Sequence, residues 1–129
     1  GLDPARAVAV LSGNSIRHAL LALAAQAVGV PYAAVSVPYS LQSADLGKLR
    51  HILAKLRPGL ILAEEGAPFA RALALPEAAG AEVVTAGPLP GATPWEDLLA
   101  MPPGAVLDRA IAAVDPDAPV KILFTSGST

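Results

Sequence analysis

Four hydroxyl side chains surround one glycine at the end of the sequence, directly after the apolar run 122–124. Glycine lets a backbone turn sharply and approach a ligand closely. Hydroxyls and free backbone N–H groups then offer many hydrogen-bond donors in a small space, which suits phosphate oxygens. We therefore predict a phosphate-binding loop, and a plain polar loop is the alternative. The candidate site residues are Thr125, Ser126, Gly127, Ser128 and Thr129.

Two better-known loops do not fit this segment. It lacks the G-x-x-x-x-G-K-[ST] pattern of a Walker A loop. A nucleophile elbow, G-x-S-x-G, requires serine where the sequence has Gly127. The position after a strand does fit, because open α/β sheets bind ligands beyond the carboxyl ends of their strands.

The remaining polar candidates have simpler explanations. His18 and His51 have no second ligand at metal spacing, so we interpret both as ordinary helix residues and expect no metal ligand. The pair Glu64–Glu65 follows an apolar run, where it would either bind a cation or lead into the next helix. Tyr39 follows Pro38 and is a candidate lining residue of a ligand cleft. No catalytic residue is assigned in this chain.

Short apolar runs alternate with helical patterns through the first two thirds of the chain. We predict strands at 8–11, 32–36, 60–63 and 82–85, and helices at 15–28, 43–57 and 68–75. This is the pattern of βαβ crossovers. It predicts an α/β fold with a mostly parallel sheet and helices on both faces, Rossmann-like or flavodoxin-like.

Residues 86–119 contain seven of the 13 prolines and are expected to form a long connection with little sheet. Within it, Thr93-Pro94-Trp95-Glu96 has capping-box spacing and predicts a helix over 94–101. We expect Trp95 to pack that helix onto the body of the domain. Further along the chain we expect a helical turn over 107–114, a turn at Asp115-Pro116-Asp117 and a final strand over 121–124.

Two of the predicted helices differ in pattern. Helix 43–57 has an apolar stripe, and its other face is a basic cluster that either is solvated or contacts phosphate or an acidic partner. The basic cluster comprises Lys48, Arg50, His51, Lys55 and Arg57. Helix 15–28 is apolar nearly all round, so we expect a second substructure of the intact protein, or a partner subunit, to cover its outer side.

The 129 residues are 53% hydrophobic and 16% charged, with a net charge of −2 and no cysteine. This composition excludes a disordered chain, a disulfide scaffold, a thiolate metal site and a strongly basic nucleic-acid binder. No apolar stretch approaches the ~20 residues that span a bilayer. We expect a single cytoplasmic domain with no membrane span, or a piece of one.

The run Leu-Phe-Thr-Ser-Gly-Ser-Thr at 123–129 resembles the opening of the phosphate-binding signature of the adenylate-forming synthetase superfamily, which continues there as Gly-x-Pro-Lys-Gly. Segments 8–15, 19–24 and 29–36 are similar to the N-terminal region of acyl-CoA synthetases. The stretch from Pro38 through Ile52 looks most like feruloyl-CoA synthases.

The resemblance implies a two-step reaction. A carboxylate attacks the α-phosphate of ATP, and the thiol of coenzyme A then displaces AMP. The loop at 125–129 would hold the β- and γ-phosphates, with Mg²⁺ sharing that role. ATP, Mg²⁺ and coenzyme A are thus the expected cofactors of the intact enzyme.

The same resemblance makes residues 1–129 a fragment of the N-terminal domain that ends inside the phosphate-binding loop, with the catalytic lysine and metal-binding glutamate beyond it. The expected partners are the remainder of its own chain and a small, ferulate-like carboxylic acid, with a homo-oligomer left open. Two alternatives stay open: an adenylation domain that loads a carrier-protein thiol, and a non-catalytic flavodoxin-like binding module.

Overall fold

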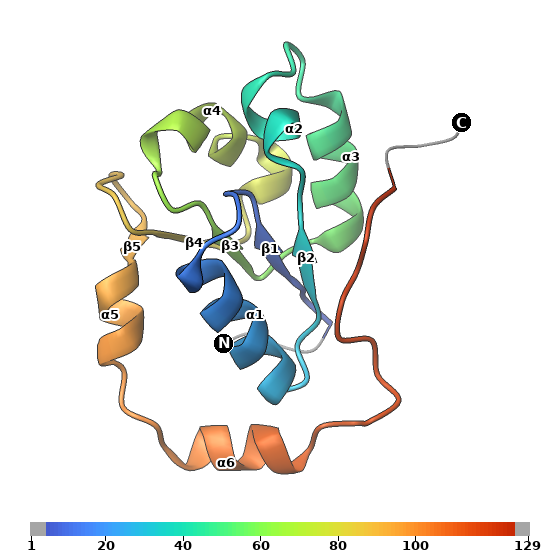
Figure 1. The fold of residues 1–129 in the computed structure, drawn as a ribbon, viewed down its shortest axis with the longest axis vertical. Helices are drawn as coiled ribbons and strands as arrows, with labels where there is room; N and C mark the ends of the chain where they lie inside the picture. The colour runs from blue at the N-terminus through green and yellow to red at the C-terminus, as the bar shows by residue number, and fades with distance from the viewer. Residues whose placement is uncertain (1–4, 126–129) are drawn as a thin grey trace.

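The computed structural model describes residues 5–125, which contain a five-stranded, all-parallel sheet (Figure 1). Its strands are β1 (Val8–Val10), β2 (Tyr32–Ala34), β3 (Leu60–Leu62), β4 (Glu82–Thr85) and β5 (Thr93–Pro94). The order across the sheet is β2-β1-β3-β4-β5. Val8 of β1 is in register with Tyr32 on one side and Leu60 on the other. This is the flavodoxin-like order, so the predicted α/β fold is confirmed.

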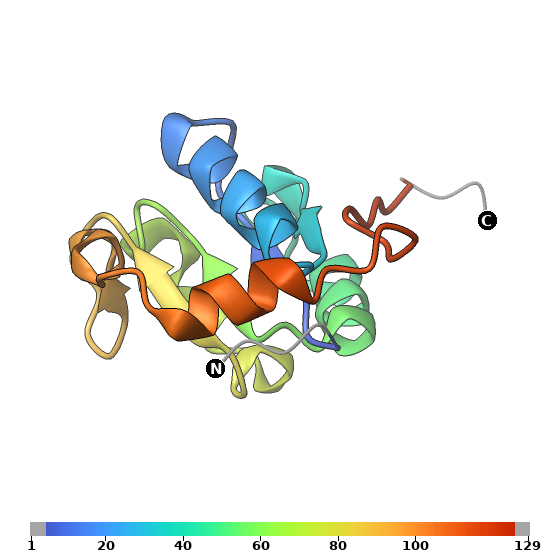
Figure 2. The same ribbon diagram turned by 90° about the horizontal axis from the view of Figure 1, so that it is seen from below.

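Helices cover both faces of the sheet, as predicted. They are α1 (Ile16–Ala27), α2 (Val37–Leu41), α3 (Gly47–Leu56), α4 (Ala70–Leu73), α5 (Trp95–Ala100) and α6 (Ala105–Ala112), with 3₁₀ turns η1 (Ala67–Phe69) and η2 (Pro76–Ala78). Val8 and Val10 pack with α1 and Trp95, whereas Ala9 and Leu11 pack with α3. The alternation follows from the two-residue period of a strand. Figure 2 shows α1 and α3 on opposite sides of the strands.

The helix ends have identifiable local causes. The Ser15 hydroxyl accepts a hydrogen bond from the N–H of His18 (3.0 Å) and caps α1, which ends before Gly29 at a φ of +74°. The Ser43 hydroxyl accepts from the N–H of Leu46 (3.1 Å), but α3 itself begins only at Gly47. The helix predicted over 43–57 therefore starts later than expected, and the hydrogen bond of Ser43 lies in its lead-in.

Two local predictions were wrong. The capping box fails because Thr93 belongs to β5, where its hydroxyl donates to Glu82 (2.9 Å), and α5 starts at Trp95 without a side-chain cap. Helix α2 includes Pro38, since proline is tolerated in a first helical turn. The helix predicted over 68–75 is divided into η1 and α4.

The final strand predicted over 121–124 is also wrong. Tyr32 donates its N–H to the carbonyl of Val120 (3.2 Å) and accepts from the N–H of Ile122 (2.9 Å), which makes one isolated bridge to β2. Phe124 packs against the core cluster beneath α3, and this contact draws the chain away from the edge of β2. We call residues 120–125 the C-terminal segment.

Residues 5–125 leave part of the apolar surface of α1 exposed. Leu21, Ala22 and Ala25 of α1 face the sheet, while Ile16 and Leu23 are 80% and 63% exposed. Helix α6 buries no side chain, although it crosses below the sheet and α1 in Figure 2. The covering layer expected for α1 stays a prediction.

Candidate functional site

The C-terminal segment is fixed to the body through Tyr32. Besides the two backbone bonds, the Lys121 ammonium lies 5.5 Å from the centroid of the Tyr32 ring. The Tyr32 ring also contacts His18 edge-on, with the ring centroids 6.3 Å apart. These contacts set the direction in which the chain leaves β2. They bring Thr125, the first residue of the predicted phosphate-binding loop, alongside α3; residues 126–129 lie outside the described residues.

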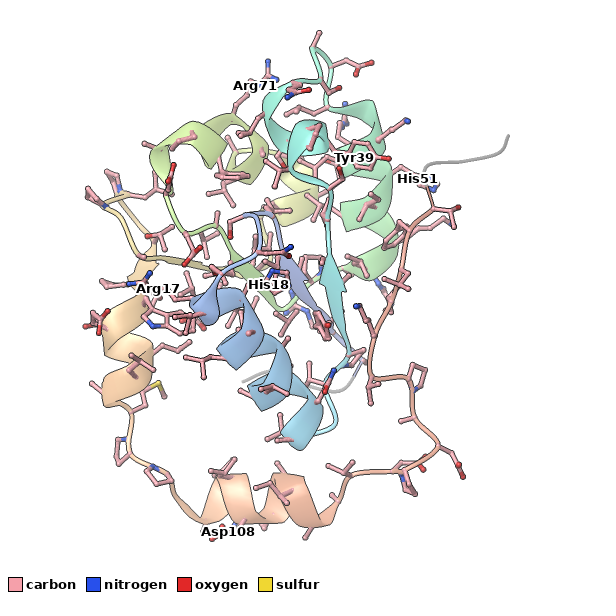
Figure 3. The ribbon with its side chains drawn as sticks, in the orientation of Figure 1. Arg17, His18, Tyr39, His51, Arg71 and Asp108 are labelled. Atoms are coloured by element: carbon pink, nitrogen blue, oxygen red, sulfur yellow. The ribbon has the colours of Figure 1, made fainter. Side chains whose placement is uncertain are left out.

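A groove of about 530 Å³ separates α3 from the C-terminal segment. We call it the α3 groove. Its polar and aromatic lining comes from three elements: Tyr39 of α2, Lys48, His51 and Lys55 of α3, and Phe124 and Thr125 of the C-terminal segment. The three α3 residues are three and four positions apart, so they share one face of the helix. Figure 3 shows Tyr39 and His51 pointing toward this side of the molecule.

The α3 groove has an unbalanced positive charge. None of its lining residues is Asp or Glu, and within residues 5–125 neither Lys48 nor Lys55 forms an ion pair. The Lys48 ammonium lies 5.2 Å from the centroid of the Tyr39 ring, a cation–π contact that leaves its charge uncompensated. The exposed Thr125 adds a hydroxyl on the facing wall. Chemically, this surface suits an anion.

Two carboxylates on or near α3 already have hydrogen-bond partners, and one of these partners, Gly47, lines the groove. The N–H of Gly47 and the Ser43 hydroxyl donate to Asp45 and hold the pKa of its carboxyl below the usual value. Glu77 accepts a hydrogen bond from Arg50 (2.9 Å), and a backbone hydrogen bond and this guanidinium lower its pKa. Both carboxylates therefore stay charged, and neither lines the α3 groove.

A second cavity, of about 420 Å³, lies past the carboxyl ends of β3 and β4. Arg17, labelled in Figure 3, forms an ion pair with Glu64 at 3.3 Å between Nη1 and Oε1. The carboxylate of Glu64 thus already has a cationic partner, and Glu65 alone offers little to a metal. Across residues 5–125 no three His, Asp or Glu side chains form a metal-binding group. This part of the chain does not fit Mg²⁺.

The other candidate residues, His18, Trp95 and Asp115, do not line the α3 groove. His18 places Nδ1 3.3 Å from the carbonyl of Gly13 and has no metal-binding neighbours. Trp95 is buried against the α1 side of the sheet, as predicted. Asp115 accepts the N–H of Asp117 (2.9 Å), which confirms the turn there.

Sequence reasoning recognised the basic cluster and Tyr39 separately and missed that they share one groove with Thr125. The three- and four-residue spacing of the α3 cations was the available signal. The return of the C-terminal segment to α3 had no signal in the sequence.

Comparison with known proteins gives one positive result. Searches of curated proteins and of solved structures found no significant match. No helix within residues 5–125 is long and apolar enough to cross a membrane. A scan against protein families matched residues 1–129 to the family described as AMP-binding enzyme. Since this match covers the whole sequence, the chain belongs to the AMP-binding enzyme family, whose activity is that of ATP-using, adenylate-forming acid ligases.

Proposed function

We propose that this chain is the N-terminal part of an ATP-dependent acid–CoA ligase that acts on an aromatic, ferulate-like acid. The family match over residues 1–129 carries the proposal. The similarity of segment 38–52 to feruloyl-CoA synthases supports the aromatic acid. In the first step, a carboxylate oxygen of the acid bonds to the α-phosphorus of ATP, and the bond to pyrophosphate breaks. In the second, the thiol of coenzyme A bonds to the acyl carbon, and AMP leaves.

The role we assign to residues 125–129 is to bind the departing phosphates. Negative charge accumulates on the pyrophosphate oxygens as their bond to the α-phosphorus breaks, and preorganised donors stabilise that charge without reorganising. Thr125 supports this role because its exposed position beside Lys48 and Lys55 is an electropositive one. Since residues 5–125 do not fit Mg²⁺, we assign the metal no step in this part of the chain.

The alternatives differ in the thiol acceptor or in the absence of chemistry. An adenylation domain that loads a carrier protein would share the first step. The strand order β2-β1-β3-β4-β5 would equally suit a flavodoxin-like binding module, but the family match favours an enzyme. Acceptor choice is therefore the property that an experiment has to measure.

The test is exchange of labelled pyrophosphate into ATP by the full-length protein with ferulate, followed by product analysis with coenzyme A. We expect ferulate-dependent exchange and feruloyl-CoA. Thr125→Val should slow exchange, whereas Thr93→Val, on the far edge of the sheet, should leave it unchanged. Residues 1–129 alone should form no acyl-CoA. Exchange that is absent with every carboxylic acid tried, or turnover by residues 1–129 alone, would refute the proposal.

A further inference from the structure

The cavity past the carboxyl ends of β3 and β4 is lined by charged side chains that the proposed function does not use. Arg17 of α1 contributes a cation, and Glu64 and Glu65 contribute two carboxylates. Ala86 and Gly87 form the remaining wall. We propose that this cavity binds a small dipolar ion, a molecule with one carboxylate and one ammonium group. Arg17 binds its carboxylate, and Glu65 binds its ammonium.

The cavity adjoins the point where the strand order of the sheet reverses. The chain passes from β1 to β2 on one side and then to β3 on the other, so β1 and β3 flank the switch point. Arg17 belongs to the helix that follows β1, and Glu64 follows β3. Open α/β sheets bind ligands in the crevice at this point. The volume of about 420 Å³ lies within the ~300–1,000 Å³ range of small-molecule sites.

Backbone hydrogen bonds hold the loops after β3 and β4 together. The N–H groups of Ala86 and Gly87 both donate to the carbonyl of Glu64 (2.8 Å each). The Thr85 hydroxyl donates to the carbonyl of Gly87 (2.8 Å). Because Ala86 and Gly87 carry little or no side chain, the wall that they form leaves room for a ligand. The cavity is therefore largely formed before a ligand enters it.

The Arg17 guanidinium has a donor that the described residues do not use. Its bond to Glu64 is 3.3 Å long, against ~2.7–2.9 Å for a well-formed charge-assisted hydrogen bond. Its Nε is buried and has no hydrogen-bond partner within residues 5–125. A buried donor without a partner costs free energy, and the planar guanidinium matches the two oxygens of a carboxylate. Because the Arg17 side chain is 42% exposed, it can turn from Glu64 to the carboxylate of a ligand.

The charges around the cavity favour a dipolar ion over a simple anion or cation. Glu65 is exposed and forms no ion pair within the described part of the chain. This carboxylate would repel a simple anion, and Arg17 would repel a simple cation. A molecule with opposite charges at its two ends satisfies both residues, because an ammonium group donates three hydrogen bonds and a carboxylate only accepts them.

The first experiment titrates the full-length protein with small ligands and follows binding by ligand-observed NMR. Glycine, β-alanine and 4-aminobutyrate carry both charged groups at increasing separation, whereas propionate carries only the carboxylate and propylamine only the ammonium. We expect at least one of the three dipolar ions to bind about tenfold more tightly than propionate or propylamine. Each single-charge ligand loses one hydrogen-bonded contact with a charged group, and such a contact contributes about tenfold or more in affinity.

The second experiment uses variants with matched controls. Arg17→Gln and Glu65→Gln should each weaken binding of the tightest dipolar ligand about tenfold. Arg109→Gln on α6 and Glu96→Gln on α5 remove exposed charges of the same two signs and should bind that ligand as the unchanged protein does. Arg17→Lys separates binding from a structural role. It restores a positive charge opposite Glu64 but not the planar donor pair, so stability to urea should recover while binding stays weak.

Three results would overturn the inference. They are the absence of binding by all three dipolar ions, propionate or propylamine binding as tightly as the best of them, and unchanged binding in Arg17→Gln or Glu65→Gln. Binding that depends on Arg17 and Glu65 would support the inference even if ferulate-dependent exchange fails, because the site does not rest on the proposed function. Exchange with ferulate but no dipolar ligand would leave the proposed function in place and remove the site.

Discussion

Replacing Leu53 with alanine tests how α3 is held against the sheet. Leu53 is 0% exposed and lies in the core cluster between α3 and the strands. Truncating this side chain to alanine loses buried apolar contacts and leaves a cavity. Together these effects lower the free energy of unfolding by about 3 kcal/mol. The matched control is Leu23→Ala on the outer face of α1, where the side chain is 63% exposed. Only about a third of the Leu23 side chain is buried, and full burial of a leucine contributes ~2 kcal/mol. This substitution should therefore lower the free energy of unfolding by less than ~1 kcal/mol.

Equilibrium urea unfolding of residues 1–129, followed by circular dichroism, measures both changes. The midpoint should fall strongly for Leu53→Ala and slightly for Leu23→Ala, with unchanged slopes. Equal losses for the two variants would contradict the assignment of inner and outer faces. The same pair in the full-length protein tests the layer expected over α1, because a covered Leu23 would then cost as much as a core leucine.

Two further predictions concern the loops. Because hydrogen bonds lower the pKa of Asp45 in the folded state below its ordinary 3.8, its contribution is complete above that value and is lost as the pH falls through the folded pKa. The urea midpoints of the unchanged protein and Asp45→Asn should thus differ at pH 7 and converge below about pH 4; a constant gap would refute this cause. Gly66→Ala should cost about 2 kcal/mol, because φ is +41° and an added Cβ would lie 3.0 Å from Leu89 Cβ. Gly91→Ala (φ +82°, no neighbour within 4 Å) should cost only about 1 kcal/mol, and equal losses in thermal unfolding would show that the contact is unimportant.

The sheet was predictable because each central strand has its own local signal. The apolar runs at β1, β3 and β4 are separated by helices with clear ends, such as Ser15 and Gly29 around α1. The failures lie at the edges. Thr93 has the local pattern of a helix cap, but pairing with β4 takes precedence over it. The C-terminal segment has the composition of a strand, and the packing of Phe124 overrides that propensity.

The candidate site was predictable only in parts. Hydroxyls around a glycine indicate phosphate, and the basic cluster of α3 is visible in the sequence. Their proximity depends on the bridge between Tyr32, at the edge of β2, and Lys121, which are 89 positions apart in the sequence. No local pattern encodes such a distance, so the α3 groove is a product of the tertiary structure alone.

Helix α6 has a mechanical consequence, because none of its side chains is buried. An eight-residue helix without tertiary support is only marginally stable in water. As a helix these residues span ~12 Å, and fully extended they span ~26 Å. Melting α6 would therefore release ~14 Å of slack between the sheet and the C-terminal segment. The connection is therefore of adjustable length, and it can extend while the strands stay in register and the Tyr32 contacts keep the C-terminal segment in place.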